Sequence, residues 1–175
     1  MEQPKSVGIG RFEAELFDVE LPLGLKVQSV HITGESVQIS HPPFKLVAPN
    51  PAKVRIVVLE AAITEMLANN TSLGLKKIQV RLADGRVHVD AAITILVELS
   101  LTAVCTLRVV DESKIYIDIE SVKAHGVGIK QLVTSRLETL NPVLDAKMLP
   151  IPAKLHRLEI GDRKLTAWGE VSPPE

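Results

Sequence analysis

Aromatic residues are scarce in this sequence: Phe, Trp and Tyr make up only 3% of its 175 residues, whereas 46% are hydrophobic. The interior must therefore be filled almost entirely by aliphatic side chains. Such side chains pack a dry core well, and they would also suit acyl chains, which have no preferred stacking geometry. The composition alone does not decide between a solid core and an interior that holds lipid.

Four further features of the sequence exclude broad classes of protein. Cys105 is the only cysteine, which excludes a disulfide framework and a cysteine-based metal site. The net charge is −1, so no bulk field attracts nucleic acid or an acidic membrane. No uncharged apolar run approaches the roughly 18–20 residues of a membrane span, and residues 1–12 lack the features of a signal peptide. We expect a cytoplasmic or peripheral membrane protein as written, or an exported one if an N-terminal signal has been trimmed.

Catalytic and metal-binding motifs are also missing from the sequence. The five histidines are scattered and none has a metal-ligand spacing. There is no Gly-x-Ser-x-Gly nucleophile elbow, and Gly126 and Gly128 lack the third glycine of a dinucleotide fingerprint. We therefore predict that the protein is not an enzyme, and that it has no cofactor, no metal and no nucleic-acid partner.

The most regular pattern lies in residues 87–110, where every second residue is apolar and most of the residues between them are polar. This alternation is typical of strands with one buried face. A straight strand of this length would run roughly 80 Å at ~3.3 Å per residue, about twice the width of a compact domain of this size. The apolar parity never switches, so the segment is either one long curved strand or two strands joined by an odd-length loop. We favour a turn near residues 96–99.

Turn residues predict two further hairpins. The parity switches across Asp84-Gly85, as a two-residue turn requires. It is kept across Asp111-Glu112-Ser113, which fits a three-residue loop. Residues 59–70 and 128–142 show helical spacing of apolar side chains, and Asn141-Pro142 ends the second helix.

Together these elements predict one domain over residues 1–175 with an α+β fold. A large, curved, mainly antiparallel sheet would be wrapped around the two amphipathic helices. An internal repeat is also predicted, because a helix, a strand, a tight turn and a strand follow one another in about residues 58–95 and again in about 127–171.

The segment from residue 127 to 171 resembles the C-terminal part of the LmeA-like phospholipid-binding family. The shared features are a helix ending in Leu140-Asn141-Pro142, a Leu-Pro-x-Pro run at 149–152, and a Gly161-Asp162 turn before a strand ending in Gly169. The resemblance implies an exported or membrane-associated protein that binds phospholipid and has no catalytic residues. It also implies a sheet that wraps a helix, similar to tubular lipid-binding domains. The chain departs from the family in having no visible export signal.

The resemblance makes binding of phospholipid or another acyl-chain ligand our leading hypothesis, with lipid carriage or envelope maintenance as the process served. The ligand would lie in an aliphatic groove between the sheet and the helices. The predicted groove walls are Ile63, Met66, Leu67, Ile93, Ile95, Val97, Leu132, Val133 and Leu137. The alternative is an interaction or structural module with a solid core, which binds a protein partner, or a second copy of itself, through an exposed sheet edge.

Peripheral membrane contact is predicted from two proline-rich apolar loops and from the single tryptophan. The loop residues could either insert into lipid or plug the ends of the core. The predicted contact residues are Phe44, Leu46, Val47, Met148, Leu149, Ile151 and Trp168. Trp168 and Tyr116 have the parity opposite to the core, so their rings would be exposed or covered by another strand or loop.

Overall fold

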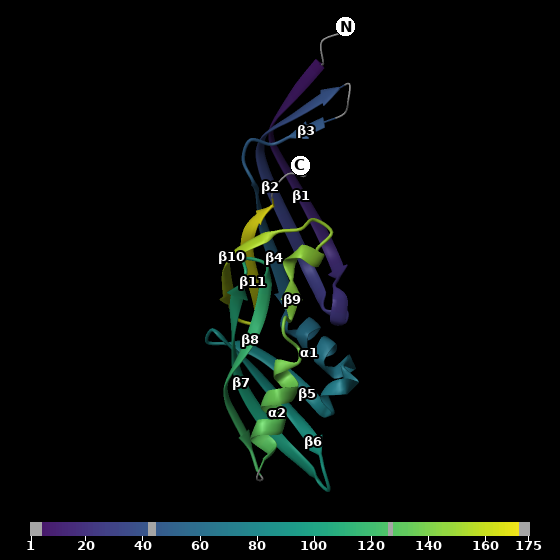
Figure 1. Cartoon of the computed structure of the whole chain (residues 1–175), viewed down its shortest axis with the longest axis vertical. Coiled ribbons are helices and arrows are strands. Elements are labelled where there is room, and N and C mark those ends of the chain that lie inside the picture. The colour runs from purple at the N-terminus through teal and green to yellow at the C-terminus, as the bar shows by residue number, and fades with distance from the viewer. Residues whose placement is uncertain (1–4, 42–44, 126–127, 172–175) are drawn as a thin grey trace.

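A computed structural model describes residues 5–41, 45–125 and 128–171 of the chain. The molecule is mainly β, with 62% of its residues in strands. The strands form two antiparallel sheets that follow one another along the axis of an elongated body, with the helices beside the second sheet (Figure 1).

The first sheet has the strand order β1-β2-β4-β11-β10, and β3 pairs with the far end of β2. The long β1–β2 hairpin keeps one register from Lys5 opposite His41 to Glu20 opposite Lys26. Its strands are β1 (Lys5–Glu20), β2 (Lys26–His41), β3 (Lys45–Val47), β4 (Ala52–Leu59), β10 (Lys154–Ile160) and β11 (Lys164–Val171). Side chains alternate between buried and exposed along β4, so one face of the sheet forms core.

The second sheet has the order β5-β6-β7-β8-β9 and is a simple meander. Its strands are β5 (Leu75–Ala83), β6 (Arg86–Thr94), β7 (Glu98–Val110), β8 (Lys114–Ala124) and β9 (Leu144–Asp145). The apolar stripe recognised in the sequence supplies its inner face, on which Val87, Val89 and Ala103 are almost fully buried.

Helix α1 (Glu60–Asn69) lies along the edge strand β5 and accepts hydrogen bonds from two of its free backbone amides. The amide of Leu82 donates to Glu60 Oε2 at 2.7 Å, and the amide of Val80 donates to Thr64 Oγ1 at 3.2 Å. Helix α2 (Ile129–Glu138) follows β8 and buries Ile129, Val133 and Leu137, four residues apart. Three short 3-10 turns cover Pro22–Gly24, Thr71–Leu73 and Ala146–Met148.

Backbone hydrogen bonds join the two sheets. Arg163, in the β10–β11 turn, accepts from the amide of Glu60 at 3.0 Å and donates to the carbonyl of Leu82 at 3.2 Å. The amide of Leu155 in β10 donates to the carbonyl of Glu112 in the β7–β8 turn. The core of the two sheets is therefore continuous.

The predicted architecture was wrong. There are two sheets instead of one, the fold is mainly β instead of α+β, and the sheets are not wrapped around the two helices. The physical reason is visible at α1. This helix buries only Met66 and Leu67, and its polar side chains accept hydrogen bonds from the backbone amides of β5. The sheets follow one another along the long axis, and each helix buries only two or three side chains beside the second sheet.

The local predictions were more accurate than the global one. Asp84 and Gly85 form the β5–β6 turn with φ of 53° and 71°, the left-handed conformation that a two-residue hairpin turn needs. The β7–β8 loop is Asp111–Ser113, as predicted. The stripe of residues 87–110 is two strands joined by an odd-length turn at residues 95–97, one residue before the predicted position. Both predicted helices exist, although α2 ends at Glu138. The repeat stays a prediction, because its two hairpins lie in different sheets.

Candidate functional site

An apolar cavity lies where the two sheets, α1 and the segment between α2 and β9 meet. Its volume is about 40 Å³. No polar side chain lines it: the lining residues are Leu25, Val58, Ile63, Met66, Leu67, Val87, Val89, Leu107, Ile115, Ile117, Leu140, Val143, Leu144 and Leu165. A cavity of this chemistry stays dry and favours apolar guests.

The cavity is much smaller than a ligand site. Pockets that enclose small molecules measure roughly 300–1,000 Å³, against about 40 Å³ here. An acyl chain would enter only if the lining side chains moved apart. Ile63, Leu107 and Val143 are both cavity lining and half-buried, so the cavity lies directly beneath the molecular surface.

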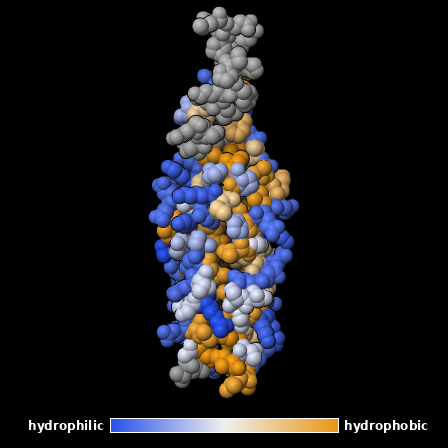
Figure 2. All heavy atoms as spheres, turned by 45° about the vertical axis from the view of Figure 1, so that its right-hand side comes forward, coloured by the Kyte–Doolittle hydropathy of each residue, from blue (hydrophilic) through white to orange (hydrophobic). Residues whose placement is uncertain are grey.

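Hydrophobic residues also reach the surface beyond this cavity. Figure 2 shows them as a stripe along the long axis of one face, between hydrophilic margins. The half-buried apolar side chains that pack against the core include Phe12, Ala14 and Leu16 of β1, and Ala62 and Ile63 of α1. A continuous apolar stripe on the surface of a protein is typical of a binding surface.

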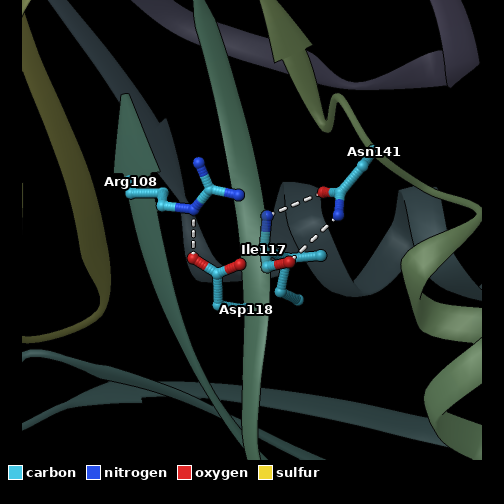
Figure 3. A network of polar contacts seen from close by, with 4 residues as sticks. All are labelled: Arg108, Ile117, Asp118 and Asn141. Atoms are coloured by element: carbon cyan, nitrogen blue, oxygen red, sulfur yellow. Dashed lines mark hydrogen bonds and ion pairs between the residues drawn. The ribbon is translucent and has the colours of Figure 1, made fainter. Parts of the chain in front are cut away.

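The cavity wall between α2 and β9 is held in place by Asn141, whose side-chain amide bonds to β8 as the backbone of a neighbouring strand would. Asn141 accepts from the amide of Ile117 at 2.7 Å and donates to the carbonyl of Ile117 at 3.0 Å (Figure 3). The amide of Val143 donates to the carbonyl of Ile115 at 2.9 Å, and Leu144 pairs with Ile115 in β9. Residues 141–144 therefore extend the second sheet past β8 and close one side of the cavity.

The opposite side of the cavity is α1, which contacts this segment differently. Within the described residues, no hydrogen bond joins α1 to residues 140–144. Ile63, Met66 and Leu67 face the cavity from one side, and Leu140 and Val143 from the other. The contacts between these two walls are apolar, whereas Glu60 and Thr64 hold α1 to β5 by hydrogen bonds.

The predicted groove walls fall into three groups. Ile63, Met66 and Leu67 line the cavity. Ile93, Val133 and Leu137 are buried in the core elsewhere, and Leu132 is half-buried against it. Ile95 and Val97 are 55% and 62% exposed in the β6–β7 turn, outside the cavity lining.

The predicted membrane-contact residues are placed only in part. Phe44 lies outside the described residues, and for Leu46 and Val47 only the backbone of β3 is described. Met148 is 58% exposed, Leu149 is buried and Ile151 is half-buried.

The two large rings lie on the outer faces of the sheets, as their parity predicted, and each is approached by an arginine. The guanidinium of Arg157 lies 4.5 Å from the centroid of Trp168, and that of Arg108 lies 5.4 Å from the centroid of Tyr116. Arg108 is also held by Asp118 from the neighbouring strand (Figure 3). Both rings are half-buried, and the side chains that approach them are cationic.

Most of the cavity lining was not among the predicted residues. Val87, Val89, Leu107, Ile115 and Ile117 carry the inward parity in the sequence, so the face was readable. The part of that inner face that meets α1 is set by the hydrogen bonds between α1 and β5. These bonds join residues distant in the sequence, so no local sequence pattern reveals them.

No titratable side chain in the described part of the chain lines this cavity. Burial raises the pKa of the Cys105 thiol to about 12, and the nearby Glu120 carboxylate acts in the same direction. Among the described residues no group of three or more His, Cys, Asp or Glu side chains is placed to hold a metal ion. None of the described helices has the length and apolarity to cross a bilayer.

Comparison with known proteins assigns the chain to a family. The model of the LmeA-like phospholipid-binding family matches residues 3–170, which is nearly the whole chain, so the protein belongs to that family. The family is defined by phospholipid binding and is not a known enzyme family, and its partner class is lipid. No curated protein and no solved structure matches the chain.

Proposed function

We propose that the protein binds the acyl chains of a phospholipid between α1 and residues 140–144, without catalysis. Membership of a phospholipid-binding family is the observation that carries the proposal. The all-aliphatic lining of the cavity supports this place for the acyl chains.

The cavity of about 40 Å³ would then be the closed form of the site. Entry of an acyl chain moves α1 away from the 140–144 segment and replaces side-chain contacts with contacts to methylene groups. Each buried methylene contributes about 0.8 kcal/mol, so a chain of ordinary length offsets the lost contacts. The pairing between strands is kept in this opening, and the hydrogen bonds from β5 to Glu60 and Thr64 limit how far α1 moves. Such reversible binding suits lipid carriage or envelope maintenance.

A substitution pair on α1 tests this site. Ile63 lines the cavity, whereas Ala61 is exposed on the same helix. We expect Ile63→Asp to reduce uptake of a fluorescent phospholipid at least about tenfold, because a carboxylate is costly in an apolar site. Ala61→Asp should bind as the wild type does.

A second variant keeps the test valid if Ile63→Asp fails to fold. Ile63→Phe adds bulk to the cavity without charge, and should also reduce uptake while leaving the far-UV circular dichroism unchanged. Uptake by Ile63→Phe equal to that of Ala61→Asp would contradict the proposed site.

The alternative is a protein-interaction module with a solid core. One observation favours it: among the described strands β1 pairs with β2 alone, which leaves a strand of 16 residues as an open sheet edge. Such an edge can pair with a second copy or another chain. Concentration-dependent dimerisation without lipid uptake would favour this alternative over the lipid site.

A further inference from the structure

The β6–β7 turn carries the most exposed aliphatic side chain in the described part of the chain, Leu96, between two further exposed aliphatic residues. Ile95, Leu96 and Val97 are 55%, 95% and 62% exposed, and they are consecutive. The other exposed large hydrophobic residues, Val7, Phe17, Leu23 and Met148, are isolated from one another along the chain. In Figure 1 the β6 end of the molecule is the end opposite the N-terminus, so this turn is a tip of the long body.

Turn geometry does not require these residues. The β7–β8 turn of the same sheet has the same length and uses Asp111, Glu112 and Ser113, the polar residues that turns prefer. The β5–β6 turn uses Asp84 and Gly85. Three aliphatic side chains in water are unfavourable, so this tip is better matched to an apolar environment than to solvent.

Three lysines lie near the base of this tip. Lys76 and Lys77 lie on β5 beside the end of β6, and Lys123 lies on β8 opposite Thr102. Glu98 is paired with Lys77, while Lys76 and Lys123 form no ion pair with a described residue. The nearby Asp90 accepts from the hydroxyl of Thr102. Glu98 also interacts electrostatically with Lys76, so the three lysines at the base of the tip exceed the two carboxylates, Glu98 and Asp90, by one charge.

The spacing of Lys76 from the tip fits the layers of a membrane surface, and Lys123 lies further back, opposite Thr102, five residues after Val97. Lys76 is opposite Ala92, which is three residues before Ile95, or about 10 Å along an extended strand. Interfacial segments bury their apolar residues about 5–10 Å deep while cations stay at the headgroups. Anionic headgroups add attraction for lysines at that level.

We propose that the β6–β7 turn is a membrane-docking tip, which inserts Ile95, Leu96 and Val97 into an anionic phospholipid bilayer while Lys76 and Lys123 contact the headgroups. This inference adds a docking element to the proposed lipid site, and the two are separable by experiment. It also gives Ile95 and Val97 a different role from that of groove walls.

Vesicle flotation tests the docking tip with a matched control. The tip variant is Ile95→Ser with Leu96→Ser and Val97→Ser. The control, Phe17→Ser with Leu23→Ser, removes exposed apolar side chains from another part of the surface. On vesicles of phosphatidylcholine and phosphatidylglycerol, we expect the tip variant to bind at least about tenfold more weakly than wild type, and the control to bind normally.

Charge is tested separately from insertion. Lys76→Gln with Lys123→Gln should weaken binding to the anionic vesicles severalfold and leave weak binding to pure phosphatidylcholine unchanged. A fluorophore on Leu96→Cys should shift to the blue on anionic vesicles, whereas one on Met148→Cys should not. The buried Cys105 does not compete for the label.

Several results would overturn the docking tip: no vesicle binding by wild type, equal binding by the tip variant, or a tip variant that only abolishes self-association in sedimentation. The lipid site fails differently. Uptake of a monomeric short-chain phospholipid should survive in the tip variant and be lost in Ile63→Phe, which should still float with vesicles.

Discussion

Asn141 offers the sharpest test of how the cavity wall is held. Replacing it with alanine removes two hydrogen bonds to Ile117 and leaves the amide of Ile117, 2.7 Å from Asn141 Oδ1, without its acceptor. Each hydrogen bond contributes about 0.5–1.5 kcal/mol net, and an unsatisfied buried donor costs about 1–3 kcal/mol. Because Ile117 is part of a half-buried network, we expect Asn141→Ala to lower the free energy of unfolding by about 2–4 kcal/mol.

The expected change is large enough for routine measurement. For a chain of this size each kcal/mol lowers Tm by about 2–4 °C, so Tm should fall by roughly 4–16 °C. Urea unfolding should show a lower midpoint with an unchanged slope, because the surface exposed on unfolding is nearly the same.

Two companion variants make this result specific. Asn69→Ala, on an exposed residue at the end of α1, should change stability by less than about 0.5 kcal/mol. Asn141→Asp keeps an acceptor for the Ile117 amide but places an oxygen against its carbonyl, so its stability should lie between those of wild type and Asn141→Ala. If Asn141→Ala is as stable as Asn69→Ala, the strand-like role of Asn141 is refuted.

Two further predictions concern packing and reactivity. In Gly169→Ala the new Cβ would lie 1.8 Å from the carbonyl oxygen of Lys154, so we expect a loss of at least about 2 kcal/mol in urea unfolding. Gly10→Ala meets nothing within 4 Å and should be neutral or slightly stabilising; equal effects of the two would contradict the packing. Cys105, with its pKa raised to about 12, is protonated at neutral pH and should resist a thiol reagent up to pH 9, then react fully in urea. Native labelling at the rate of a free thiol would contradict its burial.

Sequence reasoning succeeded where the determining interactions are local. The turns at Asp84-Gly85 and Asp111–Ser113 were predictable because left-handed conformations and apolar parity are encoded within a few residues. The division into two sheets was not, because it depends on bonds between distant residues, such as those of Arg163 with Glu60 and Leu82.

The candidate site shows the same limit. Parity identified the inward side of residues 87–110, but Ile95 and Val97 lie beyond the paired part of the strands, where nothing covers them. The alternation of apolar residues predicts on which face of a sheet a side chain lies. It does not predict whether another element packs against that face. Met66 and Leu67 were found because helical spacing and burial coincide at α1, whereas Val143 lies in a connector with no periodicity.

The central claim, that the chain binds phospholipid in its aliphatic interior, is tested most directly by lipid analysis of the purified protein. An organic extract of wild type, analysed by mass spectrometry against a phosphate standard, should contain about one phospholipid per chain. An extract of Ile63→Phe, purified in parallel, should contain much less. An empty wild-type extract, together with no uptake of a fluorescent phospholipid by the lipid-free protein, would contradict the claim.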